Sequence, residues 1–254
     1  MQLPRTPSFR LDQRRAIVAG ATSGIGLGAA VALGEQGAHV TLVARTPAAL
    51  HDTATAMRAA GFDVATLPLD ITDLDATAAA ISHHGPFDIL VNSAGLARHS
   101  PATATTPTDY DAVTALNVRA AYFLATAVAR GLIAAQKPGA IITISSQMGH
   151  VGGIDRAVYC ATKHAVEGMT KAMAIEWGPH RIRVNTLCPT FIRTPLAEKT
   201  LQNPERLAWI MSKIKLGRVG EVSDIMGPVA FLASDAAALI TGTALMVDGG
   251  WTAD

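Results

Sequence analysis

Residues 15–26 read Arg-Ala-Ile-Val-Ala-Gly-Ala-Thr-Ser-Gly-Ile-Gly, a short apolar run that stops at a glycine-rich turn. The residues that follow, as far as Gln36, are rich in alanine and predict a helix. A glycine turn between a strand and a helix indicates phosphate binding, because glycines let the backbone approach a pyrophosphate resting on the helix N-terminus. The glycines are Gly20, Gly24 and Gly26, a spacing that differs from the common G-x-G-x-x-G. A turn that merely connects the two elements is the alternative.

The same alternation of strand and helix continues along the chain. Apolar or β-branched runs predict strands at residues 39–44, 63–67, 87–92, 139–145, 182–188 and 244–247, and the stretches between them predict helices at 46–60, 72–83, 108–136, from 159 onward, and 222–233. Alternating elements imply a parallel sheet with right-handed crossovers and helices on both faces. We therefore predict an α/β fold, in which residues 1–254 form one Rossmann-like, doubly wound domain for dinucleotide binding and catalysis.

Composition and charge fit one large domain without a nucleic-acid or membrane partner. The chain has 254 residues, of which 49% are hydrophobic and 16% charged, and its net charge is +1. These values allow a substantial core, and the scattered Arg and Lys residues do not indicate nucleic-acid or acidic-membrane binding. Residues 1–15 are polar and do not resemble a signal peptide, and we expect no membrane span. A cytoplasmic protein is predicted.

Cys160 and Cys188 are the only cysteines, and both lie in apolar patterns. Their spacing suggests neither zinc binding nor a disulfide framework. We predict two buried thiols, no metal site and a reducing compartment.

A second motif couples a tyrosine to a lysine. Tyr159 and Lys163 stand one helical turn apart, so both lie on one face of the predicted helix. A free phenol titrates near pH ~10 and exchanges protons poorly at neutral pH, but an adjacent ammonium favours the phenolate. Ser146 directly follows the predicted strand at 139–145 and precedes Tyr159 by thirteen positions, which leaves room for a loop before the helix. Serine and tyrosine are predicted to face one substrate oxygen.

Candidate site residues follow directly after most of the predicted strands. They are the Gly20 turn, Arg45, Asp70, Asn92, Ser146 and Pro189. In a doubly wound sheet, ligands bind at the C-terminal strand ends, where the strand order reverses. We expect these residues to converge on one site.

Together these motifs closely resemble the short-chain dehydrogenase/reductase family. The resemblance rests on Gly20-x3-Gly24-x-Gly26, Asp70, Asn92-Ser93-Ala94-Gly95, Asn117, Ser146 and Tyr159-x3-Lys163, and it extends to the ending Val247-Asp248-Gly249-Gly250. It covers essentially the whole chain. It implies an oxidoreductase that interconverts a secondary alcohol and a ketone or aldehyde by hydride transfer with a nicotinamide cofactor.

The resemblance implies four catalytic residues. Tyr159 is the general acid and base, Lys163 acidifies it and hydrogen-bonds the nicotinamide ribose, and Ser146 holds the substrate oxygen. Asn117 positions a water that connects Lys163 to solvent, although a kink or a core amide would also explain an asparagine there. These roles fit the chemistry, because hydride transfer leaves negative charge on the carbonyl oxygen and hydrogen-bond donors must meet it.

The resemblance also implies a set of cofactor-binding residues. They are Gly20, Thr22, Ser23, Gly24, Ile25, Gly26, Arg45, Asp70, Ile71, Asn92, Ala94, Gly95, Tyr159, Lys163, Pro189, Thr190, Ile192 and Thr194. NAD-preferring relatives place an acidic residue after the second strand to bind the ribose 2′-hydroxyl, whereas this chain has Ala44 and Arg45 there. Because an arginine pairs with a 2′-phosphate, we predict NADP(H) as the preferred cofactor, with NAD(H) as the alternative.

The substrate region is predicted from the loop after Ser146 and from a proline-broken segment. Candidate substrate contacts are Ser146, Gln147, Met148, Tyr159, Arg98, His150 and Arg156. Their polarity favours a sugar acid, a polyol or another small carbonyl compound, and solvated loop residues are the alternative. Residues 189–220 are expected to form an apolar substrate lid. Thr190 stands where the family usually has glycine, so its side chain is expected to shift the nicotinamide or narrow the substrate space.

Small residues also recur along the Tyr159 helix. They are Ala161, Ala165, Gly168 and Ala172. Family members commonly pair this helix across a two-fold axis, so the resemblance implies a homotetramer built as a dimer of dimers, with a contact inside the chain as the alternative.

Two other functions stay open. A 3-oxoacyl-carrier reductase shares the catalytic residues but would want a basic docking surface. A dinucleotide-sensing regulator without turnover should have lost Tyr159 or Lys163.

Overall fold

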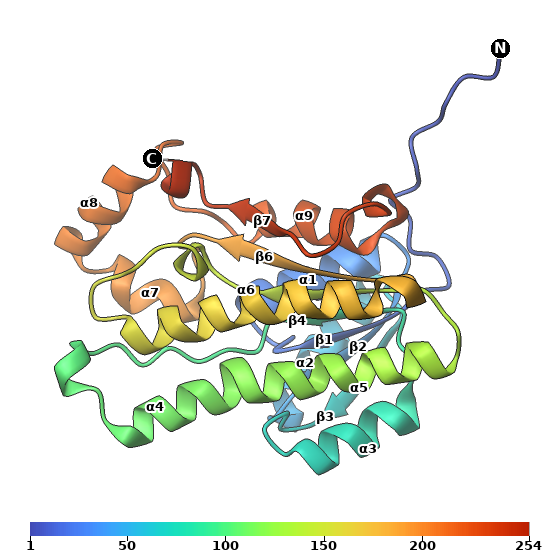
Figure 1. The fold of residues 1–254 in the computed structure, drawn as a ribbon, viewed down its shortest axis with the longest axis horizontal. Helices are drawn as coiled ribbons and strands as arrows, with labels where there is room; N and C mark the ends of the chain where they lie inside the picture. Colours follow the sequence, from blue (N-terminus) through green and yellow to red (C-terminus); the bar gives the residue numbers. More distant parts are fainter. Residues whose placement is uncertain (254) are drawn as a thin grey trace.

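Seven parallel strands form the centre of the protein in the computed structural model, which describes residues 1–253 apart from the Lys199 side chain (Figure 1). The strands are β1 (Arg15–Ala19), β2 (His39–Ala44), β3 (Val64–Pro68), β4 (Ile89–Asn92), β5 (Gly139–Ile144), β6 (Ile182–Pro189) and β7 (Ala244–Val247). Their spatial order is β3-β2-β1-β4-β5-β6-β7, and every neighbouring pair is parallel. The order reverses between β1 and β4. The predicted doubly wound α/β fold is confirmed.

Helices cover both faces of the sheet and create two cores. One layer contains α1 (Gly24–Glu35), α2 (Pro47–Ala59) and α9 (Ser223–Ala233), and the other contains α3 (Leu74–His84), α5 (Ala121–Ala134) and α6 (Ala157–Trp177). Successive residues of a strand point to opposite faces. In β1, Ala16 and Val18 therefore join the first core, while Ile17 and Ala19 join the second. All four are buried, which explains the continuous apolar run in the sequence.

One helix has the dimensions of a membrane span. The helix from Pro107 to Ala134 comprises α4 (Pro107–Thr114), a π-helical segment η2 (Ala115–Ala120) and α5, and its most apolar window has a mean hydropathy of 1.4. By length and composition alone, this overturns the expectation that no segment could span a bilayer. In the folded chain 44% of that window is buried, and α5 supplies Leu124, Val128 and Leu132 to the second core. The core helix of a soluble protein meets the same criteria of length and hydropathy.

The proline-broken segment after β6 contains two helices that sequence patterns did not predict. They are α7 (Pro195–Leu201) and α8 (Pro204–Lys213), which lie at one end of the sheet beside the C-terminus (Figure 1). Leu201 and Ile210 join a small third core with Met148 and Trp251. The two helices therefore pack on a small core that they share with the loop after β5 and with the C-terminal segment.

Short 3₁₀ segments complete the described chain. They are η1 (Ala102–Ala104), η3 (Gln147–Gly149), η4 (Gly178–His180), η5 (Asp235–Ala237) and η6 (Trp251–Ala253). Of these, η3 matters most for function, because it follows β5 directly and fixes the loop that carries Ser146. The Ser146 hydroxyl accepts a hydrogen bond from the Met148 amide (3.1 Å).

Candidate active site

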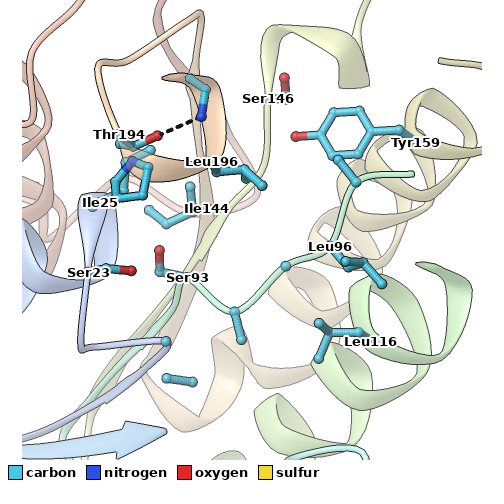
Figure 2. Close-up of a pocket in the computed structure, with 18 of the residues that line it drawn as sticks. Ser23, Ile25, Ser93, Leu96, Leu116, Ile144, Ser146, Tyr159, Thr194 and Leu196 are labelled. Carbon is cyan, nitrogen blue, oxygen red and sulfur yellow. Dashed lines mark hydrogen bonds between the residues drawn. The ribbon is translucent and has the colours of Figure 1, made fainter. Parts of the chain in front are cut away.

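A cavity of about 930 Å³ opens at the C-terminal ends of the strands, around the point where the strand order reverses. This volume lies near the upper end of the range for ligand-binding sites. The predicted site residues in its wall are Gly20, Thr22, Ser23, Gly24, Ile25, Arg45, Asp70, Ile71, Ala94, Gly95, Ser146, Gln147, Met148, Arg156, Tyr159, Lys163, Pro189, Thr190, Ile192 and Thr194. Gly26, Asn92, Asn117, Arg98 and His150 lie outside the lining. Figure 2 shows Ser23, Ile25 and Thr194 on one side, and Ser146 and Tyr159 on the other.

The glycine turn forms one end of the cavity, and a side chain at Gly20 or Gly26 would clash with the neighbouring backbone. Gly20 has a left-handed φ of 76°, and a Cβ at this position would approach the Ala94 nitrogen to 2.9 Å. A Cβ at Gly26 would collide with the Gly20 carbonyl oxygen. Ser23 precedes α1 without a side-chain capping bond, so the first N–H groups of the helix keep their capacity to bind an anion. These features fit a dinucleotide pyrophosphate.

Substituting Gly26 tests this fit. Gly26→Ala forces the turn away from α1, and we expect a loss of about 1–3 kcal/mol in stability together with weaker NADPH binding. Thermal melting and NADPH fluorescence titration measure the two effects. The matched control is Gly227→Ala in α9, where an added Cβ meets no atom within 4 Å, so stability should hold or rise. Unchanged NADPH binding in Gly26→Ala would exclude this turn as the phosphate site.

The second strand ends beside a positive and a negative group. Arg45 lies in the cavity wall and is exposed, and no described carboxylate lies within salt-bridge distance of it. Asp70 accepts hydrogen bonds from the backbone N–H (3.0 Å) and the hydroxyl (2.7 Å) of Thr72. These bonds lower the pKa of the Asp70 carboxyl, and the charge of Arg45 adds a smaller effect in the same direction. Asp70 is thus a fixed acceptor, while Arg45 keeps all of its donors.

The candidate catalytic residues come from the end of β5 and from α6. Lys163 is buried, and its Nζ donates to the Ile144 carbonyl oxygen at 2.9 Å. The same nitrogen lies 5.6 Å from the centre of the Tyr159 ring, as their helical spacing predicts. The Ser146 hydroxyl donates to the Gln147 Oε1 at 2.9 Å. The Tyr159 hydroxyl points into the cavity on the side where Ser146 lies (Figure 2).

Asn117 lies in the π-helical segment, and its side-chain hydrogen bonds join two separate parts of the chain. Its Oδ1 accepts from the Leu96 N–H (2.8 Å), and its Nδ2 donates to the Leu96 oxygen (2.9 Å) and the Thr162 hydroxyl (3.2 Å). The side chain therefore ties the loop after β4 to α6 beside Tyr159. Sequence reasoning missed Leu96 and Thr162, because all three hydrogen bonds join positions far apart in the chain.

Two residues proposed from sequence as substrate contacts are located elsewhere. Arg98 is largely exposed and lies 3.7 Å from the Asp109 carboxylate. The His150 Nε2 lies 3.6 Å from the Cys188 sulfur and 3.8 Å from a Glu167 carboxylate oxygen. Neither side chain lines the cavity.

Glu167 is a buried carboxylate that sequence reasoning did not single out. It accepts hydrogen bonds from the Thr186 hydroxyl (2.7 Å) and the Cys188 thiol (3.3 Å), one turn beyond Lys163. Burial, followed by the nearby Glu167 charge, raises the pKa of Cys188 to about 12. Cys188 is therefore a protonated, structural thiol, and Cys160 is also a free, buried cysteine.

An unpaired hydroxyl lies where the usual glycine is missing. Thr190 lines the cavity after β6, and its Oγ1 is buried without a hydrogen-bond partner among the described residues. Thr194 stands nearby, and its methyl group would touch a Cβ at Gly24. A buried hydroxyl without a partner costs free energy, so a polar group of a bound ligand fits this position.

Comparisons with known proteins agree with the geometry. A family model described as enoyl-(acyl carrier protein) reductase matches residues 20–252. D-erythrulose reductase from Gallus gallus is 41% identical over 96% of this chain and 98% of its own length. Gluconate 5-dehydrogenase from Gluconobacter oxydans is 38% identical over 96% of both chains. A solved gluconate 5-dehydrogenase from Burkholderia cenocepacia, in complex with NADP and tartrate, superimposes with a TM-score of 0.94 at 35% identity, covering 97% of this chain and 98% of that one.

Proposed function

The chain belongs to the short-chain dehydrogenase/reductase family, and from this premise we propose that it is an NADP(H)-dependent oxidoreductase of small, polar carbonyl compounds. It interconverts a secondary alcohol and a ketone or aldehyde. One observation carries the proposal: Tyr159, Lys163 and Ser146 share a cavity wall with the glycine turn that fits a pyrophosphate. A proton donor and a dinucleotide site at one cavity are what the reaction requires.

The protein's own residues supply the proton and the orientation. A nicotinamide dinucleotide held by the glycine turn and Arg45 would supply the hydride chemistry at the carbon of the substrate. During reduction Tyr159 donates a proton to the substrate oxygen, and Ser146 stabilises the developing negative charge by a hydrogen bond. Lys163, held by the Ile144 carbonyl, places a positive charge beside the phenol. In the alcohol-oxidising direction Tyr159 accepts the proton.

Arg45 supports the preference for NADP(H). It extends from the end of β2 into the cavity wall, with all its donors available for a 2′-phosphate. Asp70 forms no salt bridge within 4.0 Å with Arg45 among the described residues, and its Oδ1 accepts both hydrogen bonds from Thr72.

We expect a sugar-like substrate. Relatives that this chain matches over nearly their whole length are named as enzymes of sugars or sugar acids. Purified protein, assayed by NADPH absorbance with ketoses, keto sugar acids, cyclic ketones and acyl thioesters, tests the proposal. Turnover should be highest for a polyhydroxylated carbonyl compound. Turnover of a 3-oxoacyl thioester alone would replace the proposal with the 3-oxoacyl-carrier reductase function. NADPH binding without any turnover would favour the regulator.

We also propose a homotetramer. Ala161, Gly168 and Ala172 are exposed on α6, and a Cβ at Gly168 would meet no atom within 4 Å. On α5 the rings of Tyr122 and Phe123 are also more than two-fifths exposed. These exposed small residues are available for close pairing with the same helix of another copy. Light scattering measures the mass of the assembly directly.

A cytoplasmic location remains our proposal as well. Both cysteines are free and buried, and free thiols are typical of reducing compartments.

A further inference from the structure

The side of the cavity next to Tyr159 carries a positive charge that the described protein does not neutralise. Arg156 precedes α6 and lines the cavity, and its guanidinium is partly buried. No described carboxylate lies within 4.0 Å of it. The neighbouring Asp155 pairs instead with Arg206 of α8 at 3.2 Å. Burial lowers the pKa of Arg156, but an arginine stays protonated at neutral pH.

The two close neighbours of this guanidinium hold it without cancelling its charge. Its central carbon lies 5.2 Å from the centre of the Phe191 ring. Its Nη1 lies 2.8 Å from the His99 Nε2. Burial, with help from the charges of Arg156 and Arg206, lowers the pKa of His99 to about 4. His99 is therefore neutral at pH 7, and its Nε2 accepts from the guanidinium.

A neutral His99 that accepts through Nε2 carries its proton on Nδ1. The ring stands edge-on to Tyr159, with centroids 6.0 Å apart. His99 thus fixes Arg156 beside the catalytic tyrosine and offers one further donor. Because only one of five guanidinium N–H groups is used in this bond, the planar fork remains free for a ligand.

We propose that Arg156 and His99 form a carboxylate subsite, so that the preferred substrate is a keto or hydroxy sugar acid rather than a neutral sugar. This inference rests on the proposed function and names its substrate class. A carboxylate is a planar, two-oxygen anion that matches the arginine fork, and it compensates the partly buried charge. Neutral hydroxyl groups would leave that charge unpaired.

Matched substrates separate the two classes. We would measure kcat/KM with NADPH for D-fructuronate and for D-fructose, which share the carbon chain, the ketone and the configuration of every stereocentre and differ only in the carboxylate at C6. The wild-type enzyme should prefer the acid by at least about tenfold. Arg156→Gln should lower kcat/KM for the acid by about 10–100-fold, the value of a charge-assisted hydrogen-bond pair, and change the value for fructose little. Arg156→Lys should recover part of the loss, because lysine keeps the positive charge but lacks the planar donor geometry of the guanidinium.

A control and a second readout keep the test decisive if Arg156 also supports the fold. Arg130→Gln removes an exposed arginine on α5, outside the cavity, and should leave both substrates unaffected. Inhibition of fructose reduction by D-gluconate should weaken at least about tenfold in Arg156→Gln. An equal loss for acid and neutral sugar would make Arg156 structural and overturn the subsite. A wild-type preference for fructose would overturn it too, while the oxidoreductase function would stand. Absence of turnover with every carbonyl compound would instead refute the function itself.

Discussion

Tyr159→Phe will lower kcat by about 10²–10⁴-fold, the contribution of a positioned general acid, and leave NADPH affinity nearly unchanged. The phenyl ring retains the packing of Tyr159 against His99 and Lys163, so only the hydroxyl that points into the cavity is lost. Steady-state kinetics on the best substrate and NADPH fluorescence titration measure the two quantities.

A surface tyrosine provides the control. Tyr110 is 52% exposed on α4, and Tyr110→Phe should keep wild-type activity. A residual rate in Tyr159→Phe within tenfold of wild type would assign proton transfer to another group. A comparable loss of NADPH affinity would mean that the hydroxyl supports cofactor binding rather than the chemistry.

Arg45→Asp will reverse the choice of cofactor. The substitution removes the donors that meet a 2′-phosphate and places a carboxylate where NAD-preferring relatives have one. We expect kcat/KM for NADPH to fall by about 10–100-fold or more, while the value for NADH holds or rises. Arg45 is exposed and makes no described salt bridge, so the fold should be unaffected.

Two comparisons guard this result. Arg130→Asp changes the net charge equally on the exposed side of α5 and should leave the NADPH-to-NADH ratio alone. A wild-type enzyme with a strong preference for NADH would contradict the role of Arg45 before any substitution is made.

The sheet was predictable from sequence because its signals are local. Strands buried on both faces read as short apolar runs, and β1, β2 and β7 begin and end where the pattern placed them. The helices α7 and α8 were not predicted, because prolines at 195 and 204 suggested breaks. Both prolines stand at the first helical turn, where they are tolerated. The apolar residues of these helices pack against Met148 and Trp251, which are distant in sequence.

The site was predictable where a motif fixes the backbone, and less so where side-chain direction decides. The glycine turn, Ser146 and Tyr159 line one cavity, as expected from strand ends that meet at one edge. His150 follows Ser146 closely, yet it points to Glu167 and Cys188, because η3 turns the chain between them. The hydrogen bond between Arg156 and His99 joins residues 57 positions apart, so no local sequence pattern predicts it.

The most direct test of the account is a crystal structure of the enzyme with NADP⁺ and its alcohol product. We predict that the reacting oxygen lies about 2.6–3.2 Å from both the Tyr159 and Ser146 hydroxyls, with its carbon facing the nicotinamide ring. An oxygen bound away from both hydroxyls, or a dinucleotide whose pyrophosphate does not rest on the Gly20–Gly26 turn, would contradict the account.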